Sequence, residues 1–251
     1  MKITANAKIN IGLNVVGKRT DGYHNLETIF YPVSMCDIIE IELSPDAETH
    51  LINIGIAVDS NPQDNLIIKA YNLLKQDFDI PVVSITLDKR IPFGAGLGGG
   101  SSDAANTLKA LNQMFSLGLS DLELESYAVK LGADCPFFIK NKPVFATGIG
   151  NEFTPIDLDL SAYKIEIIKP NVSVSTAMAY KGVTPKPSTF NLLELPKLLI
   201  EQWNRVVKND FEASVFPQFP EIEVLKQKFY NRGAIYASMS GSGSAVFGVF
   251  L

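Results

Sequence analysis

A run of small residues at positions 92–105 is the part of the sequence best suited to chemistry: Pro-Phe-Gly-Ala-Gly-Leu-Gly-Gly-Gly-Ser-Ser-Asp-Ala-Ala. Five of these fourteen residues are glycine, and glycine lets the backbone approach a ligand closely. Residues 82–88 alternate like a strand before it, and the apolar residues after it share one helical stripe. The unpaired amides and positive dipole end of a helix N-terminus suit an anion with many oxygens. The sequence therefore predicts a phosphate-binding loop.

Two other interpretations of this loop compete with phosphate binding. A plain turn between packed elements needs fewer glycines, because each glycine adds to the entropy lost on folding. A dinucleotide fingerprint G-x-G-x-x-G also matches, at Gly94, Gly96 and Gly99, and leaves a nicotinamide or flavin oxidoreductase as an alternative. That fingerprint belongs in a βαβ unit, which this part of the sequence does not predict. No Gly-Lys-Ser/Thr closes the loop, so it is not a Walker A motif.

Other side chains that could do chemistry lie in the first strand and in the loop after it. Residues 3–15 alternate with period two, so Lys8 and Asn10 are expected on the same, non-core face. A solvated outer face is the plain alternative for them. The loop ends in Tyr23 and His24, which could hold a planar ring or simply anchor the loop.

A carboxylate stands alone between two elements farther along the chain. Asp134 follows an expected helix end and precedes an apolar segment stiffened by Pro136. It could act in chemistry, or it could form a turn by accepting bonds from nearby backbone amides.

The elements that must position these residues follow from periodicity and turn residues. A segment at 141–160 is rich in Gly, Pro, Asn and Asp, which predicts two domains, 1–155 and 156–251. The expected strands are 26–33, 37–43, 51–58, 163–169, 234–239 and 245–250, the last two flanking a small-residue loop at 240–244 that reads equally well as a hairpin turn or a ligand contact. The expected helices follow an N-cap at Asp64 and a capping box at Ser120–Glu123, and cover 195–209 and 220–231.

Composition excludes several classes of protein. The 251 residues are 46% hydrophobic and 20% charged, as in an ordinary globular protein, and no run of 18 apolar residues predicts a membrane span. The net charge of −5 argues against non-specific nucleic-acid binding. Two unpaired cysteines, Cys36 and Cys135, fit a reduced, cytoplasmic compartment. Two histidines are too few for a His-rich metal site.

The complete string Pro-x-Gly-Ala-Gly-Leu-Gly-Gly-Gly-Ser-Ser resembles the phosphate-binding motif of the GHMP kinase family of galacto-, homoserine, mevalonate and phosphomevalonate kinases. Residues 7–10 with 21–24 resemble the N-terminal signature of a member whose substrate carries cytidine diphosphate. Residues 239–243 are similar to the family's C-terminal glycine motif, and 132–137 resemble its catalytic aspartate segment.

The resemblance implies a role for each candidate residue. Lys8 and Asp134 would form the catalytic pair, with Asp134 accepting the proton of the substrate hydroxyl and Lys8 stabilising charge. Asn65 and Lys89 would lie near the ATP base. The substrate pocket would be lined by Asn10, Tyr23, His24 and Tyr180, and the ATP phosphates would be wrapped by Gly94, Ala95, Gly96, Leu97, Gly98, Gly99, Gly100, Ser101, Ser102, Asp103 and Ala104.

The implied fold is the α+β, two-domain GHMP kinase fold, with the active site in the cleft between the domains. The implied cofactors are ATP and Mg²⁺, with unknown metal ligands, and the implied partner is a small-molecule cytidine-diphosphate substrate. We expect a monomer or homodimer that binds neither nucleic acid nor membrane. Alternatives within the resemblance are a mevalonate, homoserine or sugar kinase and a non-catalytic nucleotide-binding paralogue.

Overall fold

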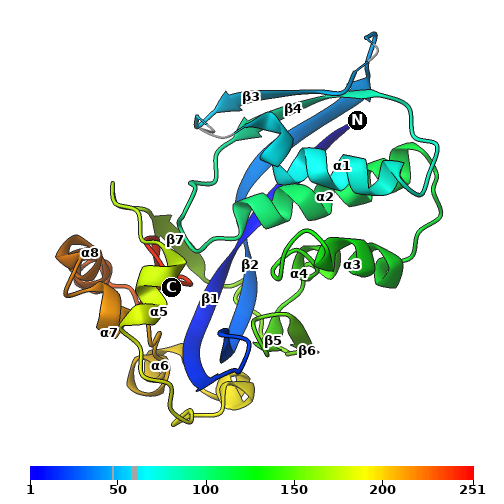
Figure 1. The fold of residues 1–251 in the computed structure, drawn as a ribbon. Coiled ribbons are helices and arrows are strands. Elements are labelled where there is room, and N and C mark those ends of the chain that lie inside the picture. The colour runs from blue at the N-terminus through cyan, green and yellow to red at the C-terminus, as the bar shows by residue number, and fades with distance from the viewer. Residues whose placement is uncertain (47, 58–60) are drawn as a thin grey trace. The chain divides into compact units, whose positions relative to one another are not determined.

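The computed structural model describes residues 1–46, 48–57 and 61–251 (Figure 1). The strands of this part of the chain are β1 (Lys2–Lys18), β2 (His24–Leu43), β3 (His50–Gly55), β4 (Val83–Lys89), β5 (Val144–Thr147), β6 (Glu152–Pro155), β7 (Lys164–Ile168), β8 (Tyr236–Met239) and β9 (Val246–Phe250). The α-helices are α1 (Leu66–Lys75), α2 (Gly99–Met114), α3 (Asp121–Val129), α4 (Phe137–Lys140), α5 (Thr176–Lys181), α6 (Ile200–Val206), α7 (Glu212–Val215) and α8 (Pro220–Asn231), with 3₁₀ helices η1 (Pro62–Asp64) and η2 (Leu192–Lys197).

The chain divides into two compact units that alternate along the sequence. The first comprises the described residues of 1–7, 33–93 and 98–141, and the second comprises residues 8–32, 94–97 and 142–251. Strands β1 and β2 and the glycine-rich stretch contribute residues to both. We predicted two domains that follow one another in sequence, 1–155 and 156–251. That boundary stays a prediction.

The first unit places helices α1 and α2 side by side next to the paired strands β3 and β4 (Figure 1). Strand β3 runs parallel to β4, which pairs antiparallel with residues 38–43 of β2. Burial alternates along β4, so Val83, Ile85, Leu87 and Lys89 all point inward. The predicted order of strand, glycine loop and helix is confirmed.

Several sequence-based boundaries differ from the structure. Residues 37–43 are the second half of the 20-residue strand β2. Strand β3 ends at Gly55, and position 58 of the strand predicted there lies outside the described residues. The N-cap of α1 is Asn65, whose Oδ1 accepts the Ile67 amide at 2.9 Å, in place of Asp64.

The helix predicted over 195–209 is also divided, into η2 and α6. Pro196 lies inside η2, and a proline has no amide for the i→i−4 ladder of a continuous α-helix. Leu198 and Leu199 are extended and separate the two helices.

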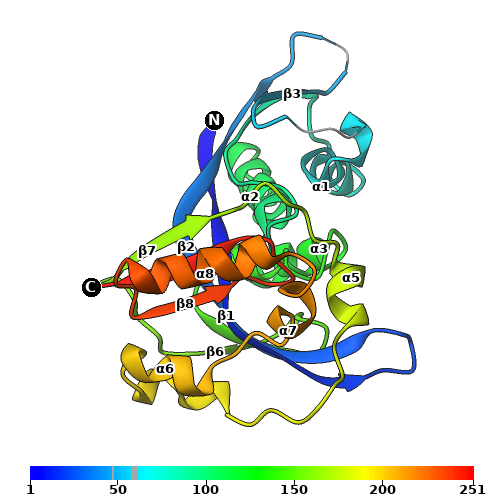
Figure 2. The ribbon, with the colours of Figure 1, turned by 90° about the vertical axis from the view of Figure 1, so that its left-hand side faces the viewer.

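The second unit contains the sheet β7-β9-β8, with α8 packed along β8 and β9 (Figure 2). Helix α8 has the predicted bounds and begins at Pro220, whose missing amide costs nothing in the first turn. Its buried residues Ile222 and Phe229 join Ala237, Met239 and Val246 in one apolar core. Strands β8 and β9 form the predicted hairpin around the loop at 240–244.

No helix among the described residues has both the length and the hydropathy needed to cross a membrane.

Candidate functional site

Three segments that are far apart in the sequence are joined by hydrogen bonds in the second unit. The Lys8 amide donates to the Leu97 carbonyl at 3.0 Å, which ties β1 to the glycine-rich stretch. The Asn10 amide donates to Ser240 Oγ at 3.2 Å, and that hydroxyl donates to the Gly96 carbonyl at 2.8 Å. The candidate segments of β1, the glycine-rich stretch and the C-terminal loop therefore form one structural junction.

Glycine is required where these loops touch. A Cβ on Gly96 would lie 2.0 Å from the Ser240 carbonyl oxygen, and the residue has a φ of +71°. A Cβ on Gly241 would lie 3.1 Å from the Gly96 Cα. Because no side chain fits between the two backbones, the loop at 240–244 is more than a hairpin turn: it packs directly on the glycine-rich stretch.

Lys8 and Asn10 lie on one face of β1, as predicted, but that face is buried. Lys8 Nζ donates to Asn10 Oδ1 at 2.6 Å and lies 4.5 Å from the centre of the Phe30 ring. Asn10 Nδ2 donates to Thr28 Oγ1 at 3.0 Å. Lys8 is 4% and Asn10 2% exposed, so the expectation of a non-core face was wrong. Local alternation cannot show that β2 and the C-terminal loop cover this face.

Asn209 supports the junction and was missed by the sequence analysis. Its Nδ2 donates to the carbonyls of Met239 and Gly241, each at 2.8 Å, and its Oδ1 accepts the Phe211 amide at 3.0 Å. The side chain is buried. A single Asn between two charged residues forms no recognisable sequence motif, so its role is visible only in the folded structure.

An aromatic cluster in the second unit brings two of the predicted substrate residues together. The rings of His24 and Tyr180 stack at 4.7 Å with 17° between their planes, and Tyr180 meets Phe211 edge to face. A cavity of about 420 Å³ beside them is lined by Lys18, His24, Ala177, Tyr180, Lys181, Val183, Thr184 and Pro185. Tyr23, by contrast, is 62% exposed.

The first unit holds the start of helix α2, which the sequence predicts at the ATP phosphates. Gly98 is the N-cap with a φ of +68°, and its carbonyl accepts the Ser102 amide at 2.9 Å. Ser102, Asp103 and Ala104 are buried. Their side chains therefore pack inside the unit, and phosphate binding at this turn stays a prediction.

The aspartate predicted to be catalytic lies in the turn before α4. Asp134 is half-buried and belongs to the first unit, whereas Lys8 belongs to the second. Burial raises the pKa of the neighbouring Cys135 thiol to about 11, and the Ser101 side chain in the first turn of α2 acts in the opposite direction. The pairing of Asp134 with Lys8 stays a prediction.

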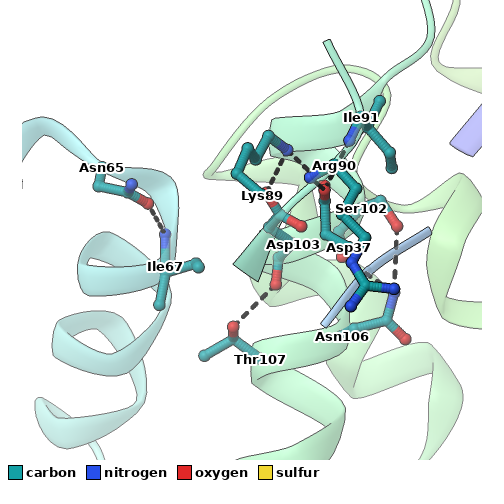
Figure 3. A network of polar contacts seen from close by, with 10 residues as sticks. All are labelled: Asp37, Asn65, Ile67, Lys89, Arg90, Ile91, Ser102, Asp103, Asn106 and Thr107. Carbon is teal, nitrogen blue, oxygen red and sulfur yellow. Dashed lines mark hydrogen bonds and ion pairs between the residues drawn. The ribbon is translucent and has the colours of Figure 1, made fainter. Parts of the chain in front are cut away.

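The two residues predicted near the ATP base are both engaged within the first unit. Asn65 caps α1 through its side-chain oxygen. Lys89 is 1% exposed, and its ammonium lies between the carboxylates of Asp37 and Asp103 (Figure 3). Their contact with ATP stays a prediction. Among the described residues, no three His, Cys, Asp or Glu side chains are grouped to hold a metal ion.

Comparison with known proteins identifies the protein family to which the chain belongs. The model of the GHMP kinases N terminal domain matches residues 65–142, and that of the GHMP kinases C terminal domain matches 191–251, together more than half of the chain. The chain belongs to the GHMP kinase family, as its glycine motifs predict. Family membership also accounts for Gly94-x-Gly96-x-x-Gly99 without a dinucleotide-binding fold.

Within this family the chain is more than half identical to relatives that share one name. The 4-diphosphocytidyl-2-C-methyl-D-erythritol kinase of Bacteroides fragilis is 53% identical, covering 98% of this chain and 90% of the relative. That of Parabacteroides distasonis is 54% identical with the same coverage. A crystal structure of 4-(cytidine 5'-diphospho)-2C-methyl-D-erythritol kinase superposes with a TM-score of 0.83 at 33% identity, covering 99% of this chain and 90% of that one. The predicted GHMP kinase fold is confirmed.

Proposed function

We propose that the protein is an ATP-dependent kinase that phosphorylates the 2-hydroxyl of 4-diphosphocytidyl-2-C-methyl-D-erythritol, a step of non-mevalonate isoprenoid precursor biosynthesis. The observation that carries this proposal is identity above one half, over 98% of the chain, with relatives that bear this kinase's name. The junction of Lys8, Gly96 and Ser240 supports it, because the three motif segments are joined by direct hydrogen bonds.

ATP is proposed to bind through the glycine-rich stretch and the first turn of α2. Amides at a helix N-terminus donate to phosphate oxygens, and the helix dipole favours their negative charge. Gly94 has a φ of +57°, and a Cβ built there would meet open space, which leaves its backbone accessible. Mg²⁺ commonly binds through substrate phosphates together with water and one or two carboxylates, so we propose that it arrives with ATP.

Asp134 is proposed as the base for the substrate hydroxyl and Lys8 as the charge stabiliser. Phosphoryl transfer depends more on positioning and charge neutralisation than on covalent chemistry. The ammonium of Lys8 is buried and held by Asn10, and a charge acts more strongly where water is excluded. A half-buried carboxylate such as Asp134 can accept a proton once a cation keeps it ionised.

The cytidine is proposed to bind at the aromatic cluster. His24 would read the edge of the base, Tyr23 and Tyr180 would enclose its ring, and Asn10 would contact the rest of the substrate. Because His24 and Tyr180 stack on each other in this structure, base binding would exchange that stack for one between the base and Tyr180. Cytoplasmic location and a monomeric or homodimeric state stay predictions.

The test is an assay of the purified protein with ATP, Mg²⁺ and the cytidyl substrate, followed by ADP formation. Mevalonate and homoserine serve as comparison substrates. We expect turnover with the cytidyl substrate alone, loss of turnover but retained ATP binding in Asp134→Ala, and a raised KM for the cytidyl substrate in His24→Ala. Turnover with a comparison substrate in place of the cytidyl substrate would reject the proposed specificity.

A further inference from the structure

A cluster of three charged side chains is buried at the start of α2 (Figure 3). The ammonium of Lys89 contacts Asp37 and donates to Asp103 Oδ2 at 2.8 Å. Asp37 Oδ1 accepts the amides of Arg90 at 2.5 Å and of Ile91 at 2.8 Å. All three charged side chains are almost completely inaccessible to solvent.

Two members of the cluster lie at opposite ends of the loop that carries the glycines. Lys89 ends β4 just before the glycine-rich stretch, and Asp103 lies in α2 just after the last glycine of that stretch, Gly100. Their contact joins residues 14 positions apart and so closes the base of the loop that carries the glycines. Asp37, through the two amides that follow Lys89, fastens that base to β2. We call Asp37, Lys89 and Asp103 the loop clamp.

Gly99 is shaped to fit the loop clamp. A Cβ on this residue would lie 3.0 Å from Lys89 Nζ and 2.9 Å from Cγ2 of Ile91. The first residue of α2 therefore leaves the space through which the lysine side chain reaches Asp103. Gly99 has a φ outside the left-handed region, so this close packing, and not backbone strain, explains why a glycine stands here.

The loop clamp is not explained by stability alone. Burying an ion pair removes both charges from water, and an apolar replacement of similar volume often folds as well or better. Here one ammonium faces two carboxylates, and among the described residues Asp103 Oδ1 has no hydrogen-bond partner. Burial first of all, and then the Asp37 charge, raise the pKa of Asp103 to about 7, whereas Lys89 lowers it.

We propose that Asp37, Lys89 and Asp103 are positioning residues of the nucleotide site, which hold the two ends of the glycine-rich stretch together so that the amides at the start of α2 stay aimed at the phosphates. This inference rests on the proposed binding of ATP at that turn. The loop clamp gives Lys89 a role that needs no contact with the nucleotide. A closed loop loses less entropy when it orders around a ligand, so the expected benefit is tighter ATP binding.

The test compares two charge-neutral variants, Asp103→Asn and Asp37→Asn. Both substitutions keep side-chain shape, and the amide introduced by Asp37→Asn retains an oxygen for the backbone amides of Arg90 and Ile91. We expect the Kd for a non-hydrolysable ATP analogue and the KM for ATP to rise about tenfold, which corresponds to about 1.4 kcal/mol of lost binding free energy, with less change in kcat. Amide hydrogen exchange over residues 98–102 should also become faster.

Leu74→Ala in α1 is the matched control, since Leu74 is fully buried in the same unit but lies outside the loop clamp. It should lower the unfolding midpoint and leave the Kd for the analogue unchanged. An unchanged Kd in folded Asp103→Asn and Asp37→Asn, or an equal rise in Leu74→Ala, overturns the inference. Wild-type protein that binds the analogue but does not phosphorylate the cytidyl substrate contradicts the proposed function and leaves the loop clamp standing.

Discussion

The ammonium of Lys8 donates a 2.6 Å hydrogen bond to Oδ1 of Asn10, two residues along the same strand. The Asn10 amide in turn donates to Ser240 Oγ, across 230 positions of sequence. The Asn10 side chain also donates to Thr28 Oγ1 at 3.0 Å, so the group that accepts from the buried ammonium is itself held in place. A cation held in this way needs little reorganisation when charge develops near it.

Lys8→Met should lower kcat by about a hundredfold or more, which is the usual cost of removing one charged or hydrogen-bonding group from a transition-state site. Methionine matches the length of the lysine stem and can pack against Phe30, so the fold should persist. Steady-state kinetics with ATP and the cytidyl substrate provide the measurement. Lys2→Met is the control on the same strand, because the Lys2 side chain is 65% exposed and pairs with Glu40 at the surface. Equal kcat values for the two variants would contradict the proposed catalytic role of Lys8.

Gly96→Ala should reduce both stability and ATP binding, because the new methyl group meets the Ser240 carbonyl oxygen at 2.0 Å. Gly118→Ala is a matched control, with a φ of +72° against +71° at Gly96 and no atom within 4 Å of its Cβ. Both changes carry the left-handed strain of about 1–2 kcal/mol, so the difference between them isolates the clash. Chemical denaturation and titration with an ATP analogue measure the two effects. If Gly96→Ala and Gly118→Ala change stability and ATP-analogue binding equally, the contact between Gly96 and Ser240 does not require a glycine.

The stability of the wild-type protein should depend on pH through Asp103. Its pKa rises from 3.8 to about 7 on folding, so between these values the folded state binds more protons than the unfolded state. This contribution to stability is complete below about pH 4 and is lost as the pH rises to about 7. Asp103→Asn cannot titrate and should lack this loss.

The measurement is the difference in unfolding free energy between wild type and Asp103→Asn at a series of pH values from about 4 to about 8, which spans the titration of this carboxyl. Other carboxylates, such as Glu166 with its lowered pKa, act in the opposite direction but cancel in the difference. A difference that does not change across this window would contradict the assigned titration.

Asn209→Ala should lower the unfolding free energy by about 1–3 kcal/mol, the usual cost of leaving buried polar groups without a partner. The two carbonyls that accept from its amide, those of Met239 and Gly241, belong to the residues on either side of Ser240, which contacts Gly96. The KM for ATP should rise as well. Asn231→Ala, at an exposed position at the end of α8, is the control. If the two variants have equal stability and KM, Asn209 does not support the junction.

The local sequence pattern was sufficient to predict most helices and strands and to identify the glycine motifs. The alternation before residue 92, the helical stripe after it and the Pro220 start of α8 depend on neighbours in sequence, and all three are confirmed. Boundaries were less secure where two signals competed, as at Asp64 and Asn65, where either side chain can cap a helix.

By itself, the sequence determined the family, because its glycine motifs resemble those of that family, and it determined most of the surrounding strands and helices, because periodicity acts over a few residues. Phosphate binding by the glycine-rich stretch stays a prediction. Tertiary structure alone decided that the polar face of β1 is buried, that Ser240 touches Gly96 across 144 positions, and that Lys89 is enclosed by Asp37 and Asp103. The physical reason is that burial and side-chain pairing depend on which segments, far apart in sequence, pack against each other in the fold. The local periodicity of the sequence carries no information about that packing.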